Sequence, residues 1–272
     1  GATRPRAGGQ AKANARAMTR RQRLLRVYAR LGRTYWAWAP KLLALAAVVF
    51  IPLGLVDALL NEVETSSLNV TDGLHVAALI GAVAAVTASS LFGEVFFSGA
   101  IAASLTHPED EEAPSFRRLA SHISYGKLIV VDILYVVITA LGLIAFVIPG
   151  VVALVYLSLA GPVVELEKHS VIGGFKRSLQ IVRGHFWMVA AVVIPIETVG
   201  DTLNELIVDG VHGALGHGLI PAWIGEAVGN IATAPVFSVA IVLLTLDLIH
   251  ARDGTGPVLK RRPEPVTAGD AA

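Results

Sequence analysis

The chain has 272 residues, of which 54% are hydrophobic and only 16% are charged, and its formal net charge is +1. A water-soluble domain carries about a quarter charged residues, so a soluble fold of this composition would expose too much apolar surface. Cysteine is absent, which excludes disulfides and thiolate metal sites.

Positive charge is distributed very unevenly along the chain. No Lys or Arg lies between Leu42 and Phe116 or between His185 and Ala251. The basic residues gather instead in four clusters, within residues 4–41, 117–127, 168–183 and 252–262. Apolar segments that could cross a bilayer an even number of times separate these clusters, which is the positive-inside pattern of a multi-pass membrane protein. We therefore expect a multi-pass membrane protein with both termini in the cytoplasm.

The N-terminal region is predicted to contain two parts before the first span. Residues 1–17 show no apolar periodicity and are expected to form a disordered basic tail. Residues 18–40 are predicted to form a basic amphipathic helix, because apolar side chains recur at helical spacing and arginines fall on another face. Such a helix would lie on an anionic membrane surface, or alternatively would be solvated beside the membrane.

Six transmembrane helices are predicted within residues 41–253, so the fold class is all-α. The spans are expected at residues 41–60, 74–105, 128–148, 151–166, 186–207 and 224–249. The second is longer than one crossing needs, so it is tilted, broken near Gly93 or continued beyond the membrane. Pro149–Gly150 is expected to form the outer turn between the third and fourth spans, and residues 208–223 the last outer loop. Residues 254–272 are predicted to be a disordered tail.

Three motifs between Phe146 and Trp187 resemble a known family. They are Phe-Val-Ile-Pro-Gly at 146–150, Pro-Val-Val-Glu at 162–165, and a Phe-Lys-Arg-Ser helix from Phe175 that ends in Arg-Gly-His-Phe-Trp. This pattern resembles the membrane domain attached to some bacterial glycerophosphoryl diester phosphodiesterases. The resemblance implies the membrane part only, because the family's chemistry belongs to a separate soluble barrel whose His-Arg-Gly opening this chain lacks. We expect no catalytic activity and no cofactor.

Intramembrane acids are the first candidate site. Glu197, Asp201, Glu205 and Asp209 recur every four residues and therefore share one face of the fifth span. Glu197 is predicted near mid-membrane, where a carboxylate costs about 2.5–3.5 kcal/mol. Glu94 is a second such acid, and its own apolar run holds no Lys or Arg.

Two interpretations of these acids stay open. In one, Glu94, Glu197, Asp201 and Glu205 line a path for protons or cations. In the other, only Glu197 is immersed, the acids after it lie on a solvated helix extension, and Glu94 makes a structural hydrogen bond.

Basic residues beside the spans are the second candidate site. They are expected to bind anionic lipid headgroups or a cytoplasmic partner, and the residues concerned are Arg117, Arg118, Lys176, Arg177 and Arg183. Three acids nearer the cytoplasmic ends, Asp132, Glu165 and Asp247, are expected to form ion pairs. The basic residues within their reach are Lys127, Lys168, Arg177, Arg183 and Arg252.

Small residues form ridges in two spans, at Ala77, Gly81, Ala85, Ser89 and Gly93, and again at Gly225, Gly229 and Thr233. Each ridge could pack within the bundle or form a dimer face. His212 and His217 lie on Gly-rich sequence and predict no metal site, and membrane-proximal basic clusters favour lipid over nucleic acid.

The sequence thus favours a multi-pass membrane protein without catalysis. It would act as a scaffold or accessory subunit with lipid-binding amphipathic helices, and a protein partner or second copy could dock on its small-residue ridges. The alternative is a transporter or lipid translocator that uses the intramembrane carboxylates as a proton or cation path.

Overall fold

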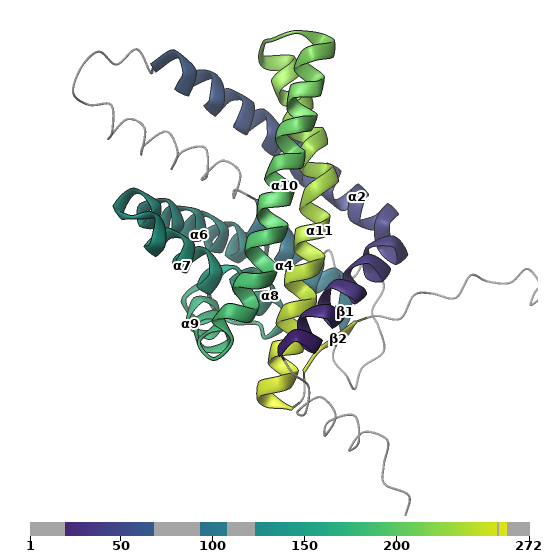
Figure 1. The fold of residues 1–272 in the computed structure, drawn as a ribbon, viewed down its shortest axis with the longest axis vertical. Coiled ribbons are helices and arrows are strands. Elements are labelled where there is room, and N and C mark those ends of the chain that lie inside the picture. Colours follow the sequence, from purple (N-terminus) through teal and green to yellow (C-terminus); the bar gives the residue numbers. More distant parts are fainter. Residues whose placement is uncertain (1–19, 68–92, 108–122, 255, 260–272) are drawn as a thin grey trace, which may run out of the picture.

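The computed structural model describes residues 20–67, 93–107, 123–254 and 256–259. Nearly all of these residues are helical (Figure 1), which confirms the all-α class. The helices are α2 (Arg20–Ser67), α4 (Glu94–Leu105), α6 (Tyr125–Ala145), α7 (Val147–Leu157), α8 (Ala160–Leu166), α9 (Val171–Val182), α10 (Phe186–Leu215) and α11 (Leu219–Asp253).

Two short strands, β1 (Thr106–His107) and β2 (Val258–Leu259), pair antiparallel. The predicted N-terminal tail lies outside the described residues, as does most of the C-terminal one. The C-terminal tail is predicted to be disordered from residue 254, but Val258 and Leu259 are paired with the segment that follows α4.

Five segments in the described part of the chain are long and apolar enough to cross a membrane: Val27–Leu59, Tyr125–Ala145, Val147–Leu166, Phe186–Leu215 and Leu219–Asp253. They are the helices of a membrane protein. The predicted second span is described only from Gly93 onward. Gly93 has a φ of 92°, so no continuous α-helix passes through it, and α4 begins at the next residue. The sequence leaves three alternatives for this long span: tilt, a break near Gly93, or continuation beyond the membrane. The conformation of Gly93 agrees with the second.

The first helix is longer than predicted. α2 runs for 48 residues through the expected boundary near residue 40, with Pro40 and Pro52 inside it. A proline in a helix removes one hydrogen bond and bends the axis, and Figure 1 shows α2 changing direction along its length. Val27 and Leu31 of its amphipathic part are buried in the same core cluster as α11. Of the apolar face predicted to lie on lipid, Leu31 is therefore covered by the bundle, whereas Tyr28 stays 39% exposed.

The turn between α6 and α7 falls at Phe146 and not at Pro149–Gly150. Phe146 is extended, with φ −165° and ψ 147°, and α7 starts at the next residue. Pro149 therefore lies in the first turn of α7, where a missing N–H costs nothing because first-turn N–H groups have no partner within the helix. A Cβ on Gly142 would lie 2.9 Å from the Gly150 Cα, so these two glycines let the hairpin close tightly.

α10 and α11 form the longest hairpin. Only residues 216–218 separate the two helices, so the predicted outer loop of residues 208–223 is mostly helical. A Cβ on Gly225 would lie 3.1 Å from the Val208 Cα, and one on Gly229 would lie 1.8 Å from the Asn204 Oδ1. The small-residue ridge of α11 therefore packs against α10 inside the protein. The other ridge lies mostly outside the described residues.

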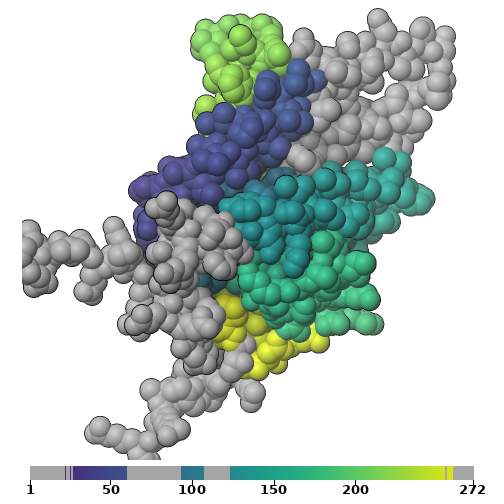
Figure 2. Space-filling model, turned by 180° about the vertical axis from the view of Figure 1, so that it is seen from behind, coloured from purple at the N-terminus to yellow at the C-terminus, as the bar shows by residue number. Residues whose placement is uncertain are grey.

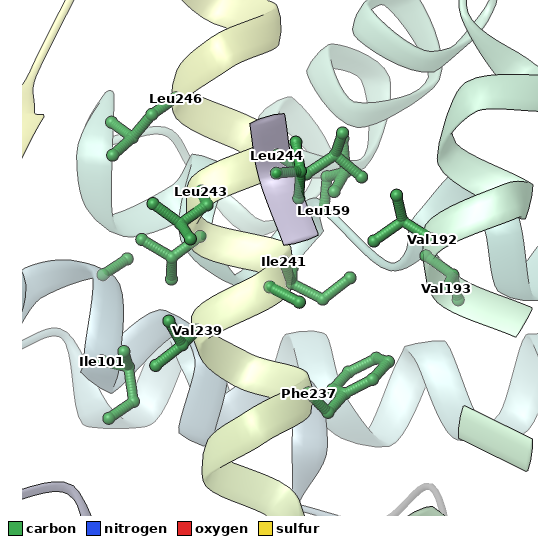
Figure 3. Close-up of a cluster of buried hydrophobic side chains, with 14 of the residues drawn as sticks. Ile101, Leu159, Val192, Val193, Phe237, Val239, Ile241, Leu243, Leu244 and Leu246 are labelled. Atoms are coloured by element: carbon green, nitrogen blue, oxygen red, sulfur yellow. The ribbon is translucent and has the colours of Figure 1, made fainter. Parts of the chain in front are cut away.

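The core is built around the second half of α11 (Figure 3). Side chains from this helix point to both sides, toward Ile101 of α4 on one side and toward Val192 and Val193 of α10 on the other. The α11 residues labelled there are Phe237, Val239, Ile241, Leu243, Leu244 and Leu246.

Charged residues from three helices meet at one end of the molecule, which we name the basic end and define by Arg30, Arg177 and Arg252. Arg30 pairs with Asp247 at 3.1 Å, Arg177 pairs with Asp253, and Arg252 donates to the Gln180 carbonyl. The tip of the α10–α11 hairpin projects at the opposite end, while the α6–α7 hairpin points sideways (Figure 1). Seen from behind, α2 crosses the face of the molecule below that tip (Figure 2).

Candidate functional site

Asp132 of α6 covers the first turn of α4. Its Oδ2 accepts a hydrogen bond from the Gly93 N–H at 2.7 Å, and its Oδ1 accepts from the Val95 and Phe96 N–H groups at 3.1 and 3.2 Å. These N–H groups have no partner within α4, and a carboxylate at a helix N-terminus also complements the helix dipole. Among the described residues, the partners of Asp132 are backbone N–H groups and not the basic side chains that the sequence predicts.

This arrangement positions Glu94, the first residue of α4, beside Glu197 of α10. The two side chains lie within hydrogen-bonding reach of each other. Within the acidic stripe of α10, Glu197 is buried, with 9% of its surface exposed, whereas Asp201 and Glu205 are exposed. The sequence names Glu94 and Glu197 as separate candidates, and the fold brings them together.

The two carboxyl groups have few other partners. Among the described residues, no donor reaches Glu94 Oε2 or either carboxyl oxygen of Glu197, and these three atoms are buried. The apolar segments that contribute the two acids hold no Lys or Arg at all. A carboxylate can only accept hydrogen bonds, so two carboxyl groups bond to each other only when a proton lies between them. A bond between Glu94 and Glu197 would therefore require a shared proton.

Tyr135 and Asp201 extend the pair into a larger group, and we call Glu94, Glu197, Tyr135 and Asp201 the carboxyl cluster. The Tyr135 side chain is fully buried, its hydroxyl lacks a partner in the described structure, and it lies within electrostatic range of both glutamates. Asp201 interacts electrostatically with both glutamates from one turn further along α10. No three or more His, Cys, Asp or Glu residues in the described ranges are arranged to hold a metal ion.

The basic residues predicted to bind headgroups differ in their surroundings. Arg117 and Arg118 lie outside the described residues. Arg177 donates two hydrogen bonds of 2.8 Å to Glu167 and also pairs with Asp253. The hydrogen bond to Glu167 raises the pKa of Arg177, so the guanidinium stays charged and is occupied within the protein. Lys176 and Arg183 are exposed on the outer side of α9.

Two of the expected ion pairs are present. Lys168 contacts Glu165 at 2.8 Å, as the sequence predicts. Asp247 is paired as well, but with Arg30 of α2, a residue that the sequence does not indicate.

Sequence reasoning missed two buried polar residues. Asp57 in the first span has only 3% of its surface exposed, and the rule that singled out Glu94, an acid inside an apolar run, could have found it. Tyr135 follows Asp132 by one helical turn and so shares its buried face, which is a weaker indication.

The chain matches no protein-family model, no curated protein and no solved structure.

Proposed function

We propose that the protein is a membrane transporter whose proton path runs through the Glu94–Glu197 pair. The observation that carries this proposal is that the buried carboxyl group of Glu197 lies next to the partly buried one of Glu94 from another helix, with three of their four oxygens lacking a donor among the described residues. An unsatisfied buried polar group costs about 1–3 kcal/mol, and more when it is charged.

The contrast with Asp132 supports a functional role for the pair. Asp132 is equally buried, and three backbone N–H groups satisfy its carboxylate. Glu197 lies in the same part of the bundle and has no such donors. A proton that binds and leaves would offset the cost of burying these acids, and strong fixed donors would hinder its exchange.

The face of α10 that carries Glu197 offers a route to water. Asp201 and Glu205 follow Glu197 at one-turn intervals toward the hairpin tip, and both are exposed. The Asp132 carboxylate, by contrast, is already engaged with backbone N–H groups at the start of α4. This asymmetry supports proton access from the tip side.

For topology, we propose six membrane segments in a bacterial inner membrane, with the basic end and both termini on the cytoplasmic side. The meeting of Arg30, Arg177 and Arg252 at one end of the bundle supports this orientation. The motifs from Phe146 to Trp187 support kinship with the membrane domain of the phosphodiesterase family, and we assign the chain no catalytic role.

A flux assay tests the proton path. The full chain is reconstituted in proteoliposomes, a pH gradient is imposed, and an enclosed dye reports its decay. We expect Glu94→Gln and Glu197→Gln each to slow the protein-dependent decay about tenfold or more, because Gln keeps the shape but cannot exchange a proton.

The matched control is Asp209→Asn, which removes an exposed acid from the same helix beyond the proposed route and should leave the decay unchanged. Equal helicity and elution volume would show that the variants are folded. Decay that is no faster than in protein-free liposomes, or that neither glutamate variant slows, would refute the path.

A second proposal is a role at the membrane surface, as the scaffold or accessory subunit that the sequence favours. The outer side of α9 favours it: Lys176 and Arg183 are exposed there beside Ile172 and Leu179, which are 66% and 41% exposed. Basic and apolar side chains together suit a helix at an anionic interface.

In nanodiscs, the protein should prefer anionic over zwitterionic lipid, and the double variant Lys176→Gln with Arg183→Gln should lose the preference. Equal binding of both lipids by the unmodified chain would exclude the headgroup role.

A further inference from the structure

The turn of the α6–α7 hairpin is apolar throughout. Residues 140–155 contain only Ala, Leu, Gly, Ile, Phe, Val and Pro. At the turn itself, Phe146, Val147 and Ile148 are 76%, 69% and 76% exposed. Burying a large hydrophobic side chain is worth about 1.5–3 kcal/mol, so placing all three in water would be unfavourable.

The tip of the α10–α11 hairpin has the opposite character. It is formed by Gly216, His217 and Gly218, all exposed, and His212 and Asp209 precede it on α10. Polar and glycine residues of this kind are typical of a turn in water. The same protein therefore has one hairpin tip suited to water and one that is not.

The backbone of the α6–α7 turn also suits a lipid environment. Phe146 is the one non-helical residue between the two helices, and its N–H donates to the Gly142 carbonyl at 2.9 Å. The Phe146 carbonyl accepts from the Gly150 N–H at 3.3 Å, and Pro149 has no N–H to satisfy. Hydrocarbon tolerates irregular backbone only where its polar groups find partners, and here the irregular part is a single bonded residue.

By length α6 can cross the bilayer, so the direction of the α6–α7 hairpin decides how deep the turn lies. Phe146 follows Lys127, at the start of α6, by 19 residues. At about 1.5 Å per residue this is about 28 Å, slightly less than the hydrocarbon thickness of about 30 Å. The hairpin also runs across the α10–α11 hairpin and not along it (Figure 1), so a membrane crossed by α10 and α11 leaves the α6–α7 turn at a shallower depth.

We propose that the α6–α7 hairpin enters the bilayer from the basic end and returns to it, with Phe146, Val147 and Ile148 seated among lipid acyl chains. The predicted outer turn therefore does not reach the outer aqueous phase. The lipid also covers the exposed apolar side of α6, which consists of Ile129, Ile133, Val137, Leu141 and Ile144. This assignment keeps Lys127 and Lys168, which flank the hairpin, on one side of the membrane.

Single cysteines test the assignment cleanly because the chain has none of its own. Ile148→Cys reports on the α6–α7 turn, and Gly213→Cys is the matched control near the α10–α11 tip, where a new side chain meets nothing within 4 Å. Both variants are placed in nanodiscs, which expose both membrane faces to water, and reacted with a charged maleimide. We expect Ile148→Cys to react at least about tenfold more slowly than Gly213→Cys, since charged reagents do not enter hydrocarbon. Both should react fully after denaturation.

A second measurement identifies what covers the turn. A fluorophore on Ile148→Cys should be quenched by lipids that are brominated on their acyl chains, and one on Gly213→Cys should not. Rapid labelling of Ile148→Cys would place the turn in water and overturn the proposal. Slow labelling without quenching would also overturn it, because protein and not lipid would then cover the turn. Phe146→Cys, two positions earlier in the same turn, repeats both measurements.

Discussion

Asp132 and Glu197 show how immediate surroundings decide the role of a buried carboxyl group. Both lie on apolar helices, and only 2% of the surface of Asp132 and 9% of that of Glu197 are exposed. Asp132 accepts hydrogen bonds from three N–H groups at the start of α4, so its negative charge stabilises the N-terminus of that helix. Glu197 has another carboxyl group as its neighbour. The first arrangement stabilises a helix end, and the second is the one that we propose holds a proton.

Removing the Asp132 carboxylate should therefore destabilise the protein. Asp132→Ala leaves three first-turn N–H groups without acceptors, and we expect it to lower the free energy of unfolding by about 3 kcal/mol or more. Asp132→Asn keeps one acceptor oxygen and should lower the free energy of unfolding by less. Denaturant unfolding of the full chain in detergent, followed by circular dichroism, measures both.

The matched control is Ile133→Ala, the next residue on α6, which is 43% exposed and points away from the bundle. This variant should lower the free energy of unfolding by about 1 kcal/mol or less. Equal losses for Asp132→Ala and Ile133→Ala would contradict the role of Asp132 as the acceptor for α4.

Close helix crossings through glycine set the position of α4. A Cβ on Gly161 of α8 would lie 2.1 Å from the Val95 carbonyl oxygen and 2.9 Å from the Val95 Cγ1. Because a backbone atom stands so near, only glycine allows the observed approach. Val95 directly follows Glu94, so the α4–α8 crossing also helps to place the carboxyl pair.

Widening this crossing should affect both stability and proton movement. We expect Gly161→Ala to lower the free energy of unfolding by about 1–3 kcal/mol, because the two helices must separate. Gly126→Ala is the control: this helical glycine of α6 has nothing within 4 Å of a new Cβ. It should be neutral or stabilising by up to about 1 kcal/mol. Similar thermal shifts for the two variants would contradict the tight crossing.

Element-level features were predictable where they depend on local composition. Apolar runs predicted most of the membrane helices, and Gly93 marked the break in the second one. Pro149 misled the prediction because proline is ordinarily read as a boundary. Pro149 instead fits the first turn of α7, and Pro40 lies inside α2, which packs along α11.

The candidate site was predictable only in part. Glu94 and Glu197 stood out one by one, since acids are rare in apolar runs. Their contact depends on how α4 and α10 pack, which no local pattern reports. Arg177 illustrates the same limit: periodicity placed it on the polar face of its helix, but its pairing with Glu167 and Asp253 depends on the fold.

At the scale of the whole molecule, positive charge is confined to one end of the α10–α11 hairpin. Arg30, Arg177 and their acid partners gather at that end, and the tip at the other end carries acids and histidines without Lys or Arg. A proton that enters from the tip side meets acids before it meets any fixed positive charge. This arrangement would attract cations toward the buried pair.

The central claim is that Glu94 and Glu197 share an exchangeable proton. Infrared difference spectra of the full chain in lipid, recorded between acidic and alkaline buffer, detect the C=O stretch of a protonated carboxyl and its shift in heavy water. We predict a band that disappears in both Glu94→Gln and Glu197→Gln and that persists in Asp209→Asn. A spectrum that is the same in the unmodified chain and in both glutamate variants would contradict the claim.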